Sequence, residues 1–273
     1  MNFYENKVAY ITGGSTGIGL ALSKALATEG SHVIIFARTV SKLETAKEEI
    51  KSNVRFADQK INFYSVDTSD HEQVKNIFEL AIKENGTPDI LINCVGIAQP
   101  DYFENISPAS FDKTIKTNLY STWNVCSVVV PFMKKKGGYI MNTSSIAGFL
   151  GVFGYTDYCM TKFGILGFSE ALRSELKSHQ IFVSVLCPPD TDTPGLEAEN
   201  ATKPAETKAI SGNAKLLSPE FVAQTVLQQL PSKKFMIIPG IEGKLTWIVK
   251  RLFPWLLDLF MEGSIKKVQK SKT

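Results

Sequence analysis

Short runs of apolar residues alternate along the chain with longer segments in which apolar residues recur every three or four positions. The apolar runs predict strands at Val8–Thr12, His32–Ala37, Ile61–Val66, Asp89–Asn93, Tyr139–Thr143 and Ile181–Cys187. The amphipathic segments predict helices at Gly17–Glu29, about Ser41–Ser52, Ser69–Glu84, Ser107–Lys135 with a break near Tyr120 or Pro131, and about Thr156–Ser178. Short apolar strands between helices are typical of a parallel sheet that is buried on both faces. We therefore predict an α/β fold with a Rossmann-type, doubly wound, mostly parallel seven-stranded sheet and helices on both faces.

Nothing in the sequence divides the main part of the chain into two domains. There is no internal repeat and no linker rich in Gly, Ser or Pro, so residues 1–240 are expected to form a single Rossmann-type domain. Within it, a long segment of about 190–217 follows the sixth strand. Long loops in compact domains are often functional, so this segment is predicted to be a substrate lid. Residues 241–273 are expected to form an apolar helical extension with a basic tail.

Composition and charge exclude several classes of protein. The net charge of +3 is too small to indicate nucleic-acid binding. The four cysteines and three histidines are scattered without the spacing of metal ligands, so we expect reduced thiols and no bound metal. No signal peptide precedes the first predicted strand, which favours a cytoplasmic location.

A glycine-rich turn joins the first predicted strand to the first predicted helix. Glycines in such a turn let the backbone approach a phosphate closely, and the helix N-terminus supplies free N–H groups and partial positive charge. The turn therefore predicts a dinucleotide-binding site, although a tight packing corner would need the same residue types. The candidate cofactor-binding residues are Gly13, Ser15, Thr16, Gly17, Ile18 and Gly19.

The ends of the second and third strands bear on the choice of cofactor. NAD-binding sheets usually have an acidic residue after the second strand, but this chain has Arg38 there. Because a guanidinium can bind a 2′-phosphate through two hydrogen bonds, we predict NADP(H) as the cofactor. The alternative is a surface arginine without a ligand. Asp67 is expected to accept a hydrogen bond from the adenine amino group, or else to cap the following helix.

Ser145, Tyr158 and Lys162 have the spacing of proton-transfer groups. Residues four apart lie on the same face of a helix, so Tyr158 and Lys162 can both face a cleft. A nearby ammonium lowers the pKa of a tyrosine, which would then donate a proton to a ketone oxygen that Ser145 polarises. Asn118 is expected to hold a water behind Lys162. A Tyr-x3-Lys pair alone is commonly a coincidence, but chance is a poor explanation of the whole set.

These motifs resemble those of the short-chain dehydrogenase/reductase family over about residues 5–240. The family's Asn-Asn-Ala-Gly segment is represented by Asn93-Cys94-Val95-Gly96, and the resemblance implies that Asn93 and Gly96 keep its roles in supporting the sheet and approaching the cofactor ribose. After the sixth strand, Pro188, Thr191 and Thr193 lie where the family contacts the nicotinamide. The resemblance implies an NADP-dependent oxidoreductase that acts on a ketone.

The predicted lid is similar to that of one subgroup, the 3-ketodihydrosphingosine reductases. The similar positions are Glu197, Glu199-Asn200, Thr202-Lys203-Pro204 and Glu206-Thr207. This resemblance implies NADPH-dependent reduction of a long-chain lipid ketone in sphingolipid biosynthesis. A 3-oxoacyl thioester reductase and a hydroxysteroid dehydrogenase remain alternatives, and an NADP-sensing scaffold protein is the alternative without catalysis.

The C-terminal segment suggests two kinds of partner. Residues 245–262 are densely apolar but carry charges, which is typical of a helix that lies on a membrane surface rather than one that crosses it. The alternative is a helix that covers the substrate cleft or a subunit interface. Membrane contact would place the protein at a cytoplasmic membrane face. Family resemblance also implies a homodimer or homotetramer through the long helices.

Overall fold

The seven strands of the described residues lie in one parallel sheet, in the order β3-β2-β1-β4-β5-β6-β7. The structure is a computed structural model that describes residues 2–212 and 216–270. The strands are β1 (Val8–Thr12), β2 (His32–Ala37), β3 (Ile61–Ser65), β4 (Ile90–Asn93), β5 (Gly138–Thr143), β6 (Ile181–Leu186) and β7 (Met236–Ile237). The order reverses direction between β1 and β4, which is where doubly wound sheets bind ligands. The predicted Rossmann-type fold is confirmed, and the described sheet is parallel throughout.

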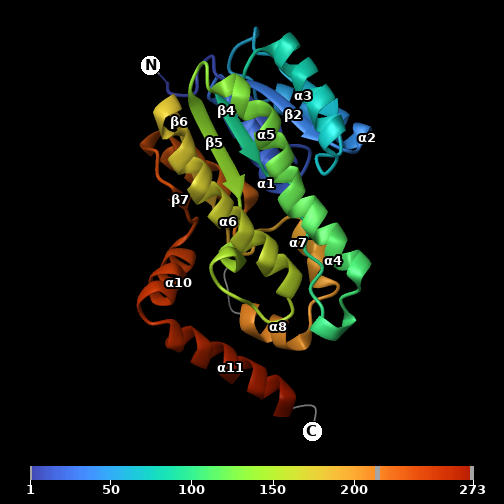
Figure 1. Ribbon diagram of the computed structural model, residues 1–273, viewed down its shortest axis with the longest axis vertical. Helices are drawn as coiled ribbons and strands as arrows, with labels where there is room; N and C mark the ends of the chain where they lie inside the picture. Colours follow the sequence, from blue (N-terminus) through green and yellow to red (C-terminus); the bar gives the residue numbers. More distant parts are fainter. Residues whose placement is uncertain (1, 213–215, 271–273) are drawn as a thin grey trace.

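The helices lie on both faces of the sheet and beyond one end of it (Figure 1). They are α1 (Gly17–Thr28), α2 (Val40–Lys51), α3 (His71–Asn85), α4 (Pro108–Ile115), α5 (Ser121–Met133), α6 (Thr156–Leu176), α7 (Pro194–Asn200), α8 (Ala205–Ser211), α9 (Pro219–Gln229), α10 (Ile241–Leu252) and α11 (Pro254–Lys270). The first six connect strands, whereas α7, α8, α10 and α11 lie beyond the arrowheads of the sheet.

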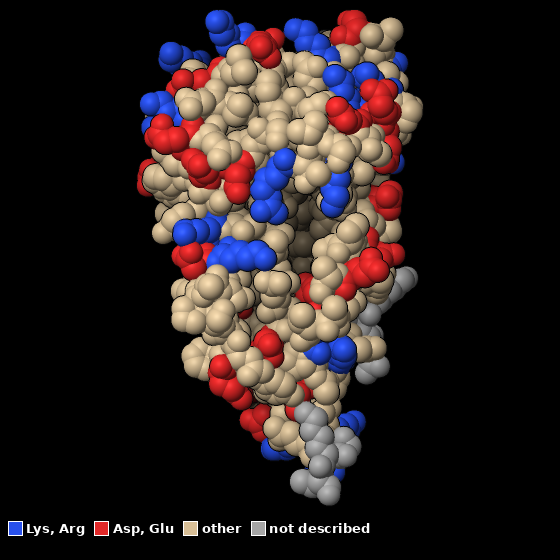
Figure 2. Space-filling view, turned by 90° about the vertical axis from the view of Figure 1, so that its right-hand side faces the viewer, with Lys and Arg blue, Asp and Glu red and all other residues tan. Residues whose placement is uncertain are grey.

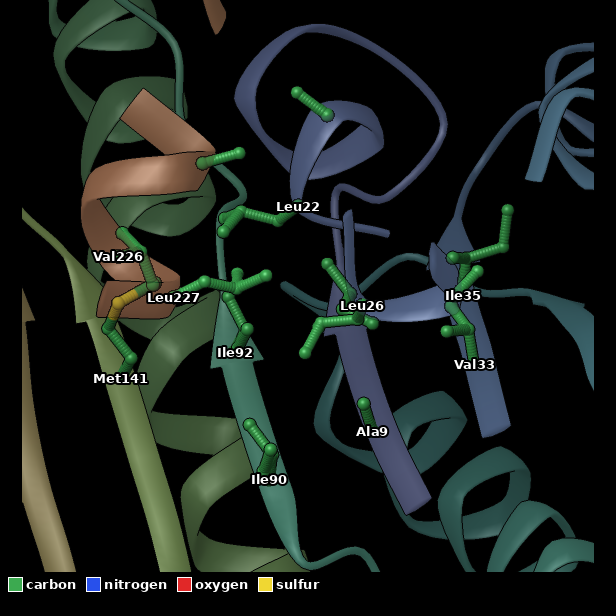
Figure 3. Close-up of a cluster of buried hydrophobic side chains, with 14 of the residues drawn as sticks. Ala9, Leu22, Leu26, Val33, Ile35, Ile90, Ile92, Met141, Val226 and Leu227 are labelled. Atoms are coloured by element: carbon green, nitrogen blue, oxygen red, sulfur yellow. The ribbon is translucent and has the colours of Figure 1, made fainter. Parts of the chain in front are cut away.

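The alternation of side chains along each strand divides the core into two layers. In β1, Ala9 and Ile11 pack toward α1 and α9, whereas Tyr10 packs toward α3 and α5. Figure 3 shows the first layer, in which Leu22 and Leu26 of α1 lie over the strands. Burial of both faces explains why the strands read as continuous apolar runs.

Polar residues at the start of the helices determine where several of them begin. The side chains of Asp70, Ser107, Thr193 and Ser218 each accept a hydrogen bond from a backbone N–H in the first turn of α3, α4, α7 and α9. A proline follows Ser107, Thr193 and Ser218 at the first helical position, where its missing N–H costs nothing. Asp70, and not Asp67, therefore caps α3.

The segment predicted as one long helix is two helices joined by a π-turn. The π-turn, Lys116–Tyr120, separates α4 from α5, so the break predicted near Tyr120 is confirmed. Pro131 lies inside α5 and does not end it. The predicted lid also differs from expectation, because 190–217 is not a loop but contains α7 and α8.

The C-terminal extension consists of two helices that pack against the end of the domain. The ring of Trp247 in α10 meets that of Phe149 edge-on at 5.0 Å between centroids. Leu257 and Met261 of α11 join the same apolar cluster as Leu150, and α8 packs against α11 (Figure 1). Within residues 2–212 and 216–270, no helix combines the length and apolar character needed to cross a membrane. Of the predicted basic tail, Lys272 lies outside the described residues.

Candidate active site

One cavity of about 830 Å³ lies at the carboxyl ends of the strands. Loops that follow β1 to β6 form its walls, and α7, α8, α10 and α11 close its far end. Figure 2 shows its mouth as a hollow with Lys and Arg side chains on its upper rim. Most of the predicted site residues line it: Gly13, Ser15, Thr16, Gly17, Ile18, Gly19, Arg38, Asp67, Gly96, Ser145, Tyr158, Lys162, Pro188, Thr191 and Thr193.

The glycine-rich turn has the geometry of an anion cradle. Gly13 and Gly17 have φ angles of +67° and +55°, in the left-handed region that other residues rarely adopt. A Cβ on Gly19 would lie 2.2 Å from the carbonyl oxygen of Gly13, so only glycine lets α1 start this close to the turn. Thr16 is the N-cap of α1 but its side chain makes no capping hydrogen bond. The turn and helix N-terminus therefore present backbone N–H groups that suit a pyrophosphate.

Charged side chains flank the outer part of the cavity. Arg38 and Lys42 are both exposed and line its wall, Arg38 directly after β2 and Lys42 in the first turn of α2. Asp67 accepts hydrogen bonds from the backbone N–H and the hydroxyl of Ser69, at 3.0 and 2.7 Å. These two cations make this edge of the cavity electropositive.

Ser145, Tyr158 and Lys162 meet in the middle of the cavity. Ser145 follows β5, and its hydroxyl accepts a hydrogen bond from the N–H of Ala147 at 3.1 Å. Tyr158 and Lys162 are one turn apart on α6, with the Lys162 ammonium 5.5 Å from the Tyr158 ring centroid. That ammonium is buried and donates to the carbonyl oxygen of Thr143 at 3.0 Å. The predicted trio is therefore brought together on neighbouring elements.

The pKa values of Tyr158 and Lys162 differ from what the sequence predicts. Burial raises the pKa of Tyr158 well above its ordinary value, and the charge of Glu199 raises it further. The Ser145 hydroxyl acts in the opposite direction but is outweighed. Burial also lowers the pKa of Lys162 to about 8. The expectation that Lys162 depresses the pKa of the tyrosine is wrong for the protein alone, because loss of hydration raises this pKa and the Ser145 hydroxyl is the group that lowers it. Tyr158 keeps its proton here.

Two predicted site residues, Asn93 and Asn118, are buried behind the cavity wall. The Asn93 amide donates to Asn142 at 2.9 Å and ties β4 to β5. Asn118 lies in the π-turn, where its amide oxygen accepts from the N–H of Ile97 at 2.8 Å, and its amide nitrogen donates to the Ile97 carbonyl and to Thr161, both at 3.0 Å. Asn93 supports the sheet, as the resemblance implies, and its side chain is buried outside the cavity wall, so its expected approach to the cofactor stays a prediction.

The loop after β6 brings the lid against the glycine-rich turn. The Cγ2 atom of Thr193 lies 3.1 Å from where a Cβ on Gly17 would be, and the Thr193 hydroxyl caps α7. Thr191 is buried and donates its hydroxyl proton to the Pro189 carbonyl at 2.9 Å. Its backbone also forms an isolated parallel bridge with Leu217. The two ends of the lid segment are therefore joined beside the cavity.

Sequence reasoning missed the residues at the inner end of the cavity. Tyr155 and Glu199 line it beside Tyr158, and the hydroxyl of Tyr155 donates to the carboxylate of Glu199. Beyond them the wall becomes apolar, with Leu150, Val152, Leu257, Phe260 and Met261. The last three belong to α11, which shows that the C-terminal segment covers the cleft. Among the described residues, no group of His, Cys, Asp and Glu side chains could hold a metal ion.

Comparison with known proteins agrees with this geometry. Residues 7–204 match the family model described as short chain dehydrogenase. The chain belongs to the short-chain dehydrogenase family. Members of this family are oxidoreductases, which disfavours a scaffold protein without catalysis.

Among curated members, the chain is 37% identical over 235 residues to the 3-ketodihydrosphingosine reductase of Mus musculus, covering 85% of this chain and 71% of that one. It is 36% identical over 272 residues to the enzyme of that name from Dictyostelium discoideum, covering 94% and 81%. A 3-oxoacyl-(acyl-carrier-protein) reductase of Chlamydia muridarum is 36% identical over 189 residues, covering 69% and 75%.

Solved structures support the fold. Levodione reductase has a TM-score of 0.78 at 22% identity, covering 89% of this chain and 98% of that one. L-sorbose reductase from Gluconobacter frateurii, complexed with NADPH and L-sorbose, has a TM-score of 0.76 at 24% identity, covering 87% and 97%.

Proposed function

We propose that this protein reduces the ketone of 3-ketodihydrosphingosine to an alcohol with NADPH. The observation that carries the proposal is the position of Tyr158, which lies in one cavity between a glycine-rich cradle and an apolar chamber. A nucleotide and a long-chain ketone can meet at such a residue. The relatives with 36–37% identity are named for this substrate, and the similarity to the Dictyostelium enzyme extends over 272 residues.

The residues of the cavity fit a nicotinamide dinucleotide. The φ angles of Gly13 and Gly17 and the uncapped start of α1 suit a pyrophosphate. Asp67 and Gly96 also line the cavity, and we propose that they contact the adenosine part of the cofactor. Arg38 is the group proposed to bind a 2′-phosphate, which favours NADP(H) over NAD(H). Pro188, Thr191 and Thr193 are proposed to bound the nicotinamide. When bound, the reduced nicotinamide supplies a hydride to the carbonyl carbon.

The chain itself supplies the proton and stabilises the charge that forms on oxygen. Tyr158 holds its proton because it is buried, and it donates this proton to the carbonyl oxygen as hydride arrives. Ser145 donates a hydrogen bond to the same oxygen. The Lys162 ammonium stabilises the phenolate that remains. Asn118 fixes the segment around Ile97, and we propose that with a water it returns a proton to Lys162.

The apolar end of the cavity suits a hydrocarbon chain. Leu150 and Val152 line one side, and Leu257, Phe260 and Met261 of α11 line another. Burial of a long chain against such side chains supplies binding free energy in proportion to the apolar area removed from water. The helices α7 and α8 are proposed to act as the substrate lid, within a domain that ends near residue 240.

We further propose that α10 and α11 contact a membrane surface. Several of their exposed side chains are large and apolar, including Leu245, Leu252, Trp255 and Leu259. The inner faces of the same helices line the cavity, so a lipid could pass from the bilayer to the site along them. A homodimer or homotetramer is proposed on a different surface, where α5 and α6 expose Trp123, Met160 and Phe163.

The test of the proposed function is turnover with three ketones. We expect loss of NADPH absorbance with 3-ketodihydrosphingosine and much slower loss with a medium-chain 3-oxoacyl thioester or a ketosteroid. Tyr158→Phe should lower turnover about 10²- to 10⁴-fold while leaving NADPH binding, followed by its fluorescence, intact. Tyr139→Phe, on β5 outside the cavity, is the matched control. Faster turnover of the thioester than of 3-ketodihydrosphingosine would contradict the proposed substrate. It would favour a 3-oxoacyl thioester reductase, the class of the Chlamydia muridarum relative.

A further inference from the structure

Three charged side chains of the lid segment, Asp190, Glu199 and Lys203, form one group beside the cavity. The ammonium of Lys203 is 3.0 Å from the carboxylate of Glu199 and 3.5 Å from that of Asp190. The side chain of Lys203 is 3% exposed, that of Glu199 15% and that of Asp190 39%. Glu199 and Asp190 line the cavity, whereas Lys203 is not part of its wall. The cation therefore lies behind two carboxylates that face the substrate space.

The charges of this group do not balance. Among the described residues, Lys203 is the only cation within ion-pair distance of Glu199, and it also forms an ion pair with Asp190. One negative charge is left over beside a largely apolar chamber. Tyr155 donates a hydrogen bond to Glu199 but carries no positive charge. A buried charge without a partner is costly, so this wall is suited to a ligand that brings a cation.

The excess charge lies next to the reacting groups. The ring of Tyr155, which holds Glu199, is 5.6 Å from the ring of Tyr158 between centroids. The charges of Glu199 and Asp190 both raise the pKa of Tyr158, so both lie within electrostatic range of its hydroxyl. A cation bound by these carboxylates would therefore be close to the ketone that receives the Tyr158 proton.

We propose that Glu199, assisted by Asp190, binds the ammonium group of the substrate and thereby selects amino ketones. This inference rests on the proposed function, because the sphingoid ketone carries its amine on the carbon adjacent to the carbonyl. A 3-oxoacyl thioester and a ketosteroid have no cation at that position. Lys203 and Tyr155 hold the Glu199 carboxylate in place, and an ammonium bound there completes the charge balance. The same contact fixes the carbonyl oxygen toward Tyr158 and Ser145.

The test compares one substrate with and without its amine. The probes are 3-ketodihydrosphingosine and the analogue with the same chain, hydroxyl and ketone but hydrogen in place of the amino group. For Glu199→Gln we expect KM for the amino ketone to rise about 10- to 100-fold, the usual value of a charge-assisted hydrogen bond. KM for the analogue should stay near that of the unmodified protein. Glu197→Gln is the matched control, because Glu197 is on the same helix, exposed and outside the cavity wall.

The outcomes separate this inference from the function on which it rests. If the unmodified protein reduces neither long-chain ketone, the proposed function fails. If it reduces the amino ketone but Glu199→Gln changes KM for both substrates equally, Glu199 is a structural residue and the inference is overturned. Asp190→Asn is a second variant in case Glu199→Gln does not fold. It removes a more exposed carboxylate, so a smaller rise in KM, again confined to the amino ketone, is the supporting result.

Discussion

At the scale of single residues, Tyr158 works in an environment that favours the protonated form. Burial and the charges of Glu199 and Asp190 raise its pKa, and only the Ser145 hydroxyl acts against them. Lys162 is buried as well, with its pKa lowered to about 8. At neutral pH Tyr158 is therefore neutral and Lys162 is still mainly an ammonium, so the phenolate that remains after proton donation to a ketone is stabilised by Ser145 and Lys162. When the substrate is bound, an ammonium near Glu199 would offset the charge of this carboxylate and so weaken its effect on the pKa of Tyr158.

Arg38 provides a residue-scale prediction about the cofactor. Arg38→Ala removes the guanidinium and with it the proposed contact with the 2′-phosphate. NADH has no 2′-phosphate, so the variant should lose no contact with NADH. We expect KM for NADPH to rise about 10- to 100-fold, as for loss of a charge-assisted hydrogen bond, with KM for NADH largely unchanged. Steady-state kinetics with both cofactors measures this.

Arg55→Ala is the matched control for that prediction, because Arg55 is exposed, lies outside the cavity and contacts the ring of Phe56. Equal changes in KM for NADPH and NADH in Arg38→Ala would show that Arg38 does not recognise the 2′-phosphate.

The sequence predicted residues whose role depends on local chemistry and missed those whose role depends on distant contacts. Gly13 and Tyr158 belong to short motifs with a defined spacing, so they could be found directly. Glu199 and Lys203 are four residues apart on the lid, a spacing that is ordinary for an exposed ion pair. Their burial, and the hydrogen bond of Tyr155 to Glu199, follow from tertiary packing of the lid. The burial of Asn93 behind the wall is likewise a tertiary property that the short motif does not reveal.

At the scale of elements, the junction of β1 and α1 is the most tightly constrained part of the site. A methyl group on Gly19 would lie 2.2 Å from the Gly13 carbonyl oxygen, so α1 would have to move away from the turn. We expect Gly19→Ala to lower the free energy of unfolding by about 1–3 kcal/mol, the usual cost of overpacking. Thermal denaturation should show a drop in Tm of at least about 3 °C, and NADPH binding should weaken with it.

Gly167 in α6 is the matched control for Gly19. It is exposed, and a Cβ there would have no atom within 4 Å. Gly167→Ala should stabilise the protein by up to about 1 kcal/mol, because alanine is the better helix former. A Tm for Gly19→Ala that matches this control would mean that the turn tolerates a side chain and is not a close-fitting cradle.

The elements that the sequence predicted well are those with a strong hydrophobic period. The first six strands and the helices that connect them were found to within a few residues, because burial of both sheet faces leaves a clear pattern. The two-residue strand β7 and the helix α9 before it were not located. The lid was harder, since α7 and α8 are seven residues each and are stabilised by contacts such as Thr193 against Gly17. The effect of Pro131 was also not decidable, because a proline in a helix can be tolerated where its neighbours pack well.

At the scale of the whole molecule, the doubly wound sheet separates two tasks. Loops on the β2 side of the cavity carry the exposed cations Arg38 and Lys42, whereas the opposite end is closed by α8, α10 and α11. The polar cofactor and the apolar chain are therefore proposed to enter from different directions. The C-terminal helices have apolar side chains on both their inner and outer faces, which is unexpected for helices that only cover a cleft.

Membrane contact is the prediction that belongs to this scale. We expect the protein to sediment with phospholipid vesicles, and more strongly when they contain anionic lipid, because Lys266, Lys267 and Lys270 follow the apolar stretch. Leu245→Glu with Leu252→Glu places two carboxylates on the outer face of α10, where both leucines are exposed and outside the cavity wall. Each buried leucine contributes about 1.5–3 kcal/mol, so the double variant should lose at least about 100-fold in vesicle affinity.

Two comparisons decide whether these helices bind lipid or a second copy of the chain. Leu80→Glu changes an exposed leucine on α3, far along the chain from α10, and should leave sedimentation unchanged. The double variant should also keep its turnover of substrate dispersed in detergent, because neither leucine lines the cavity. If the unmodified protein stays in the supernatant with both lipid compositions while the double variant lowers its molar mass in solution, the outer face of α10 is a subunit interface. The lipid would then have to reach Tyr158 without a membrane-bound entrance.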